Sequence, residues 1–324
     1  MPRRLTAVLV AIGLASACGG PAPAGSARPV IGATLLTGTH AFYKDLEAGM
    51  RDVATARGYD LVVVACEMDP AKQASQIEDF VARHVKAIIA APCDSTAVVP
   101  ALLGPERAGI PVFTVDIAAH GGKVVSHVAS DNTQGGRLAA ETLATLIGGT
   151  GKVLVIDHPT VASVQDRIKG FEEVLKKYPG ITVVGKPSAD GQRARAAQIM
   201  EDMLQAHRDL KGVFGINDDS ALGAANVIES AGRKDIVVVG FDATDEAKDA
   251  IRRGGPLKAD IAQHPRIIGE TAMNIVIRSL AGEAVPPTVA IEVAVVNAST
   301  LAAPAVPPAP APPAAPAPSS RDPN

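Results

Sequence analysis

The feature that most constrains this chain is a repeated alternation, from Pro29 onward, of short apolar runs with segments of helical periodicity. Most of the runs are nearly continuous aliphatic stretches, which are typical of parallel strands buried on both faces. Segments such as Ala41–Arg57 and Ile199–His207 carry apolar residues at helical spacing instead. The alternation predicts an α/β fold with parallel sheets.

Ten segments are predicted to be strands. They are Val30–Leu35, Leu61–Ala65, Ala87–Ala91, Val112–Val115, Val124–Val128, Val153–Ile156, Thr182–Val184, Val213–Ile216, Ile236–Val239 and Ala259–Ile261. Ten strands are many for one open sheet, and the length of 324 residues suits two domains. The chain is therefore expected to divide near its middle, with Ser130–Asn132 as a candidate crossing.

The first 17 residues have the pattern of an export signal. Two arginines precede the apolar run Leu5–Leu14, which is shorter than the ~20 residues of a membrane-spanning helix. Small residues follow, directly before Cys18, as in a bacterial lipobox. Cys18 is therefore predicted to become a lipidated N-terminus, although Ala15 stands where leucine is usual. Plain cleavage after Ala17 is the alternative.

Both ends of the predicted fold carry segments of low complexity. Residues 18–28 are rich in Gly, Pro, Ala and Ser, which is typical of a linker between a lipid and a folded domain. Residues 298–324 are rich in Ala and Pro and are expected to be a disordered tail, with partner binding as an alternative role. The protein is expected in the periplasm or at the cell surface, held to the membrane only by its lipid.

Two cysteines remain in the predicted fold. Cys66 and Cys93 each lie just after a predicted strand. Export would allow a disulfide between them. Buried free thiols are the alternative interpretation.

Several classes of function are disfavoured by what the sequence lacks. The formal net charge is −3 and there is no dense Lys/Arg stripe, so no nucleic-acid partner is predicted. There is no Ser nucleophile elbow, Walker lysine motif or His-x-x-x-His pair, so catalysis, metal and cofactor are not predicted, and Asp157-His158-Pro159 is interpreted as a strand-end loop. A repressor would need an N-terminal helix-turn-helix where the export signal stands.

Polar and aromatic side chains gather where the predicted strands end, the place where open parallel α/β sheets bind ligands. These candidates are His40, Phe42, Tyr43, Asp116, Ser130, Asn132, Asn217, Asp242 and Gln263, with Arg167 in a helix that starts near Val161. Their polar groups can donate to and accept from several hydroxyls, and aromatic faces suit a sugar ring. Taken singly, Asp116, Asp218 or Asp242 could instead be a helix cap, and Phe42 a core residue.

From Ile31 to Asn297 the chain resembles the type I periplasmic binding proteins for monosaccharides, most of all the ribose-binding members. The stretches that carry the resemblance are Phe42-Tyr43 with Gly49, Asp69–Lys72, Ile110–Val112, Val125–Asn132, Arg167–Phe171, Asn217-Asp218 with Ala221–Gly223, Val239–Asp242 and Ile261–Gln263. The resemblance implies a monomeric solute-binding protein, without a cofactor, that closes on a sugar or polyol and delivers it to an ABC permease.

The resemblance also implies where the two lobes and their three-segment hinge lie. The N-terminal lobe would comprise residues 29–130 and 264–291, and the C-terminal lobe residues 131–263 and 292–297, with crossings near 130–132, 263–264 and 291–292. It implies that the sugar is hydrogen-bonded by Asp116, Ser130, Asn132, Arg167, Asn217, Asp242 and Gln263. Phe42 and Tyr43 would pack on its ring.

Three positions depart from the family's pattern. His40 stands where the family has asparagine, Ile117 where an arginine is common, and Gly191 where an aromatic residue is expected. The loss of a bidentate arginine and of one stacking face changes specificity. Ribose is therefore disfavoured, and another pentose or hexose, a furanose or a linear polyol remains open. Presentation of a bound sugar to a chemoreceptor or sensor kinase is the alternative to transport.

Overall fold

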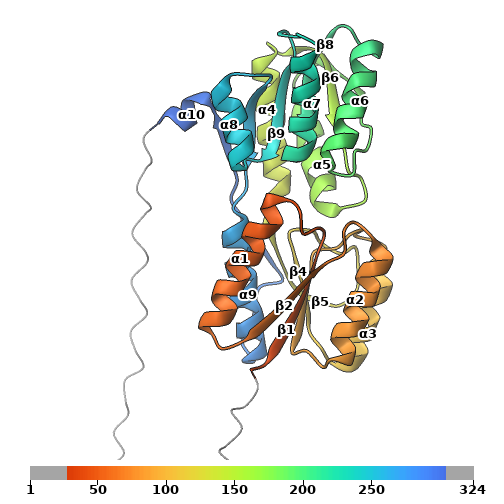
Figure 1. The fold of residues 1–324 in the computed structure, drawn as a ribbon, viewed down its shortest axis with the longest axis vertical. Coiled ribbons are helices and arrows are strands. Elements are labelled where there is room, and N and C mark those ends of the chain that lie inside the picture. The colour runs from red at the N-terminus through yellow and green to blue at the C-terminus, as the bar shows by residue number, and fades with distance from the viewer. Residues whose placement is uncertain (1–27, 304–324) are drawn as a thin grey trace, which may run out of the picture.

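The computed structural model describes residues 28–303, which form two lobes placed end to end (Figure 1). Residues 1–27 and 304–324 lie outside the described residues. The predicted export signal, the lipidation of Cys18, nearly all of the predicted linker and most of the predicted tail therefore stay predictions.

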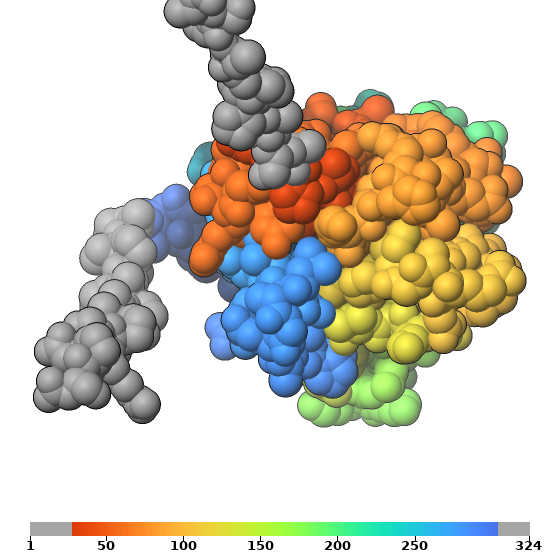
Figure 2. All heavy atoms as spheres, turned by 90° about the horizontal axis from the view of Figure 1, so that it is seen from below, coloured from red at the N-terminus to blue at the C-terminus, as the bar shows by residue number. Residues whose placement is uncertain are grey.

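The N-terminal lobe is built on a parallel six-stranded sheet in the order β11-β5-β4-β3-β1-β2. Its strands are β1 (Val30–Leu35), β2 (Asp60–Ala65), β3 (Ala87–Ala90), β4 (Val112–Val115), β5 (Val124–Ser130) and β11 (Thr288–Ile291). Its helices are α1 (Ala41–Ala56), α2 (Pro70–Ala82), α3 (Val99–Ala108) and α9 (Pro265–Leu280). The late segment containing α9, blue in Figure 2, shares this lobe with the red to yellow N-terminal segments.

The C-terminal lobe repeats this plan with the sheet order β12-β10-β9-β8-β6-β7. Its strands are β6 (Thr150–Ile156), β7 (Gly180–Gly185), β8 (Leu210–Gly215), β9 (Val237–Asp242), β10 (Leu257–Ala262) and β12 (Ala294–Asn297). Its helices are α4 (Asn132–Leu146), α5 (Ala162–Leu175), α6 (Arg193–Ala206), α7 (Asp218–Ser230), α8 (Asp245–Arg253) and α10 (Ala298–Ala302). The edge strand β12 runs antiparallel to β10, and the other pairs are parallel.

The chain passes between the two sheets three times (Figure 1). The passages lie between β5 and α4, between β10 and α9, and between β11 and β12. Each lobe is therefore assembled from segments far apart in the sequence. Three short connections at one side leave the facing ends of the sheets free to form a cleft.

The ten predicted strands are all present, with ends that differ by a few residues. Strands β11 and β12 were not predicted, because each has only four residues and lies at a sheet edge, where exposed and half-buried positions mix. The predicted start of the disordered tail at residue 298 is wrong. Asn297 accepts hydrogen bonds from the backbone N–H groups of Ser299 and Thr300 and so caps α10.

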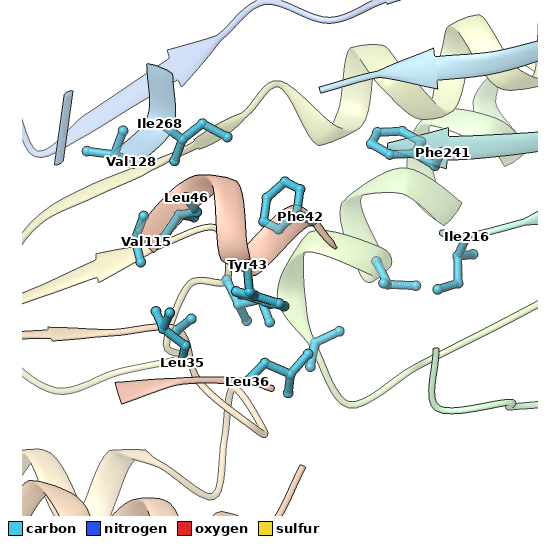
Figure 3. Packing of buried hydrophobic residues seen from close by; sticks show 14 of the residues in the cluster. Leu35, Leu36, Phe42, Tyr43, Leu46, Val115, Val128, Ile216, Phe241 and Ile268 are labelled. Atoms are coloured by element: carbon cyan, nitrogen blue, oxygen red, sulfur yellow. The ribbon is translucent and has the colours of Figure 1, made fainter. Parts of the chain in front are cut away.

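The largest hydrophobic core cluster extends from one lobe to the other. Figure 3 shows Phe42 and Tyr43, on the first turn of α1, between Leu35 in the N-terminal lobe and Phe241 in the C-terminal lobe. The two rings meet edge to face with centroids 5.2 Å apart, a favourable aromatic geometry. In the described part of the chain, no helix is long and apolar enough to cross a membrane.

Candidate ligand-binding cleft

A cleft opens where the carboxyl ends of the two sheets face each other. It encloses about 440 Å³ of space free of protein atoms, part of it open to solvent. Its wall is formed by Leu36, His40, Phe42, Tyr43, Met68, Asp116, Ile117, His158, Val161, Ser163, Val164, Arg167, Asp190, Gly191, Ile216, Asn217, Asp242 and Gln263. An apolar wall with a few convergent polar groups is typical of a small-molecule site.

The sheet order of the C-terminal lobe arranges its polar residues in a row. Gln263 follows β10, Asp242 ends β9, Asn217 follows β8, His158 follows β6 and Gly191 follows β7. Because the strands lie in the order β10-β9-β8-β6-β7, these five positions occur in that order along the cleft. The row runs from a hinge passage at Gln263 to the far edge of the lobe.

Arg167 is the buried cation of the cleft, with 4% of its surface exposed. Its Nε donates to Asn132 Oδ1 at 2.9 Å and its Nη1 to the carbonyl of Ile216 at 2.6 Å. Its Cζ lies 3.7 Å from the centroid of the Phe241 ring, a cation–π contact. These contacts hold the guanidinium plane in place.

The close approach of α4 and α5 places Arg167. A Cβ atom at Gly136 of α4 would collide with the backbone carbonyl of Arg167, and one at Gly170 of α5 would collide with that of Thr133. Only glycine permits the two backbones to lie this close. The arginine therefore comes to the cleft on a rigid helix pair rather than on a loop.

Asp116 and Tyr43 form a buried pair in the N-terminal lobe. The Tyr43 hydroxyl donates to Asp116 Oδ2 at 2.6 Å. Burial raises the pKa of Asp116, while Arg167 and the Tyr43 hydrogen bond act against that rise. Asp116 adopts φ = 63°, a strained conformation of the kind that concentrates at functional sites.

Asp242 lies at the end of β9, beside two other acidic side chains. Its Oδ1 accepts from Gln263 Nε2 at 2.7 Å, and its Oδ2 lies 3.5 Å from the backbone nitrogen of Asp218. Burial, followed by the charge of Asp218, raises the pKa of Asp242 to about 8. Behind it, burial and Asp218 also raise the pKa of Asp260. With its pKa at about 8, Asp242 holds a proton at neutral pH and can donate as well as accept hydrogen bonds.

Several contacts join the two lobes around the cleft. His40 Nε2 lies 3.0 Å from Asp219 Oδ2. On another part of the rim, the Ser95 backbone N–H donates to Thr160 O at 3.0 Å and its hydroxyl accepts from the Ala162 N–H at 2.8 Å. The structure therefore shows the lobes in contact across the cleft.

Eight of the ten predicted ligand-binding residues line the cleft: His40, Phe42, Tyr43, Asp116, Arg167, Asn217, Asp242 and Gln263. Ser130 and Asn132 do not. Asn132 contacts the cleft only through Arg167. The Ser130 hydroxyl is buried with no partner among the described residues.

For Asp116 and Asp242, the geometry decides against the alternative that these aspartates are helix caps. Asn217 caps α7 by accepting from the Ser220 N–H, and Thr244 caps α8. Asp116 and Asp242 cap no helix and face the cleft. Asn217 both caps a helix and lines the cleft, where its Nδ2 donates to Gly191 O at 3.1 Å.

The sequence reasoning missed several residues of the wall, above all His158, with Met68, Ser163 and Asp190. His158 does lie in a loop after a strand, as predicted for Asp157-His158-Pro159 from the sequence, but that loop faces the cleft. The rule that selected the other candidates, a polar residue just after a parallel strand, would have selected it too.

Cys66 and Cys93 form a disulfide, with their Cα atoms 6.7 Å apart. Cys66 follows β2 and Cys93 follows β3, the two strands that flank β1. The bond therefore links two loops of the N-terminal lobe beneath the cleft. Among residues 28–303, no group of three or more His, Cys, Asp or Glu side chains is arranged to hold a metal ion.

Comparison with known proteins agrees with this geometry. Residues 31–284 match the model of the periplasmic binding protein domain family. The ribose import binding protein of Bacillus subtilis (strain 168) is 36% identical over 260 residues, which is 80% of this chain and 84% of that protein. The D-apiose import binding protein of Actinobacillus succinogenes is 36% identical over 226 residues, 68% of this chain and 72% of that protein.

Among solved structures, an ABC transporter solute-binding protein from Agrobacterium vitis, with α-D-tagatopyranose bound, superposes with a TM-score of 0.81. It is 33% identical, and the match covers 86% of this chain and 97% of that one. The chain belongs to the periplasmic binding protein family. It is a sugar-binding-type solute-binding protein of ABC transport, and the expected type I fold of two α/β lobes is confirmed.

Proposed function

We propose that this protein binds a neutral monosaccharide or polyol in the cleft by hinge closure and delivers it to an ABC permease. The observation that carries the proposal is the position of Arg167 between two lobes that each supply an acid, Asp116 and Asp242. Its Nε and Nη1 are engaged by the protein, and no described residue accepts from Nη2. That nitrogen can donate to a ligand hydroxyl.

The remaining polar groups of the cleft fit hydroxyls better than ions. Asp242 can donate or accept, and Gln263 and Asn217 present amide groups beside it. The buried Arg167 opposes a cationic ligand, and the Asp116 side chain, which accepts from Tyr43, disfavours an anionic one. A neutral ligand with several hydroxyls satisfies this set, as do the sugars named for the relatives.

A thermal-shift screen of the mature domain against monosaccharides and polyols tests the proposal. A ligand that binds only the folded state raises the melting temperature in proportion to the logarithm of its concentration over Kd. We expect at least one neutral sugar or polyol to do so, and sugar phosphates and amino acids to have no effect. A panel in which no neutral polyhydroxylated compound shifts the melting temperature would contradict the proposal.

Hinge closure follows from the placement of ligand groups on both lobes. Ligand contacts made only in the closed form shift the population toward it. Small-angle scattering is expected to show a smaller radius of gyration at saturation with the sugar found by the screen. The His40–Asp219 and Ser95–Ala162 contacts would then form only in that closed state.

Two parts of the proposal concern partners outside the cleft. Delivery to a permease is supported by the family and by the relatives' names as import proteins. Anchoring through Cys18 is supported by the lipobox-like residues before it. Cys18→Ser is expected to release the protein from the membrane fraction or to block its maturation, and an unmodified mature wild-type N-terminus would contradict the anchor.

A further inference from the structure

His158 is a buried polar side chain in the cleft wall for which the geometry above gives no partner. It has 6% of its surface exposed and follows β6 at the edge of the cleft. Its backbone N–H is bound by Asp157 Oδ1 at 2.7 Å. Neither of its ring nitrogens forms a hydrogen bond with any residue in the range 28–303. The ring nitrogens are not among the fully enclosed polar atoms that lack a partner, so they are reached from the cleft, and a ligand that enters it can bond to them.

Gly191 keeps the imidazole open to the cavity. A Cβ atom at this glycine would lie 3.7 Å from His158 Nδ1 and 3.2 Å from Asn217 Nδ2. Any larger side chain there would cover both groups, and the backbone φ of +67° disfavours other residues. The two side chains therefore face the cleft together because position 191 lacks a side chain.

His158 lies beside Asn217 in the cleft wall, because a Cβ atom at Gly191 would be close to both side chains. The charges that act on His158 are those of Asp190, Asp94 and His40. The sheet order agrees, because β6, which His158 follows, is the direct neighbour of β8, which Asn217 follows.

The protonation state of the imidazole determines which ligand groups can form hydrogen bonds with it. Burial lowers the pKa of His158 and outweighs the opposite effect of Asp190 and Asp94. The ring is therefore neutral at pH 7, with one nitrogen that donates and one that accepts. A hydroxyl can meet either nitrogen, whereas an apolar methyl group would leave the ring unsatisfied.

We infer that His158 determines specificity by hydrogen-bonding a ligand hydroxyl that lies beside Asn217. The ligand class is thereby narrowed to sugars or polyols that carry a hydroxyl at this position, and deoxy analogues that lack it are rejected. This inference rests on the proposed function, since it requires a sugar or polyol in the same cleft.

Matched pairs of sugars test this inference by calorimetry. The probes are D-ribose with 5-deoxy-D-ribose, D-galactose with D-fucose, and D-tagatose with 1-deoxy-D-tagatose. Wild type is expected to bind the hydroxylated member of at least one pair about 10-fold or more tightly than its deoxy partner. His158→Phe should bring that ratio to within about 2-fold, and His158→Gln, which keeps a donor and an acceptor, should retain part of it.

Controls separate this inference from a folding defect. His207→Ala, at the carboxyl end of α6 and away from the cleft wall, should leave the ratio unchanged. The melting temperature of each variant reports folding. In wild type, the ¹⁵N chemical shifts of the His158 ring should move on saturation with the bound probe, a signal that does not depend on any substitution.

The possible results separate a failure of the His158 role from a failure of sugar binding itself. An unchanged ratio in folded His158→Phe, together with an unmoved ring signal, overturns the role of His158 while sugar binding itself stands. If none of the six probes nor any compound of the wider panel binds wild type, the proposed function fails and this inference fails with it.

Discussion

The two walls of the cleft differ in what they offer a ligand. The N-terminal wall is mainly apolar and aromatic, with Leu36, Phe42, Met68 and Ile117 beside the Tyr43–Asp116 pair and His40. The C-terminal wall carries most of the hydrogen-bonding groups, in a row from Asp242 to His158, with Arg167 above its Phe241 support. Under the proposed function, the C-terminal lobe would identify the ligand, while the N-terminal lobe would cover it and exclude water.

The first prediction concerns the stability of the lobes, because only the N-terminal lobe has a disulfide among residues 28–303. Replacing both Cys66 and Cys93 by alanine removes a cross-link between residues 27 apart in sequence. The free energy of unfolding should fall by about 3–4 kcal/mol. Hydrogen exchange should show the loss in β1–β3 and little change in β6–β9. Equal loss of protection in both lobes would show that they unfold as one unit.

Arg167→Ala should cause the largest loss of affinity on the C-terminal wall. It removes charge-assisted hydrogen bonds, worth about 1.5–3 kcal/mol each, and leaves Asp116 and Asp242 without their buried cation. We expect affinity for the sugar found by screening to fall about 100-fold or more in calorimetry. Arg137→Ala, which breaks a half-exposed pair with Glu173 on the same helix pair, is the matched control and should leave affinity intact.

The acidic cluster of the C-terminal wall should make stability depend on pH. The pKa of Asp242 is raised in the folded protein from 3.8 to about 8. The folded state therefore retains a proton that the unfolded chain has already lost above about pH 4. The free energy of unfolding should fall as pH rises through this window, and the melting temperature should fall by several degrees.

Asp242→Asn should flatten that slope, because the amide does not titrate. A weaker dependence of stability on pH should remain in this variant, because the pKa values of Asp218 and Asp260 are also raised. Asp245→Asn, at an exposed position in α8, is the control and should keep the wild-type slope. A wild-type melting temperature that rises between pH 5 and 8 would contradict the assignment of the retained proton.

The smallest effect is expected on the N-terminal wall. Tyr43→Phe removes the hydroxyl that donates to Asp116 at 2.6 Å and keeps the aromatic ring in the cleft wall. A single hydrogen bond contributes about 1 kcal/mol, so affinity should fall about 5-fold. Tyr178→Phe, outside the cleft wall, should have no effect. A loss as large as that of Arg167→Ala would overturn the contrast between the two walls.

Local sequence determined the elements of this protein. Continuous aliphatic runs such as Ala87–Ala90 fix buried parallel strands, because both faces of such a strand must be covered. Helical periodicity placed α1 to within one residue at its carboxyl end. The position of polar residues directly after strands was enough to find Asp116, Asn217 and Asp242, since parallel strands bring their carboxyl ends to one edge.

Tertiary structure decided which of these residues meet. Asn132 supports Arg167 instead of lining the cleft because α4 and α5 pack closely through Gly136 and Gly170. The sheet order, which the sequence does not state, places His158 beside Asn217 and brings Asp260 behind Asp242. Periodicity is a local property that depends only on residues close together in the sequence. The cleft depends on contacts between distant segments, whose arrangement is selected only when both sheets bury their faces together.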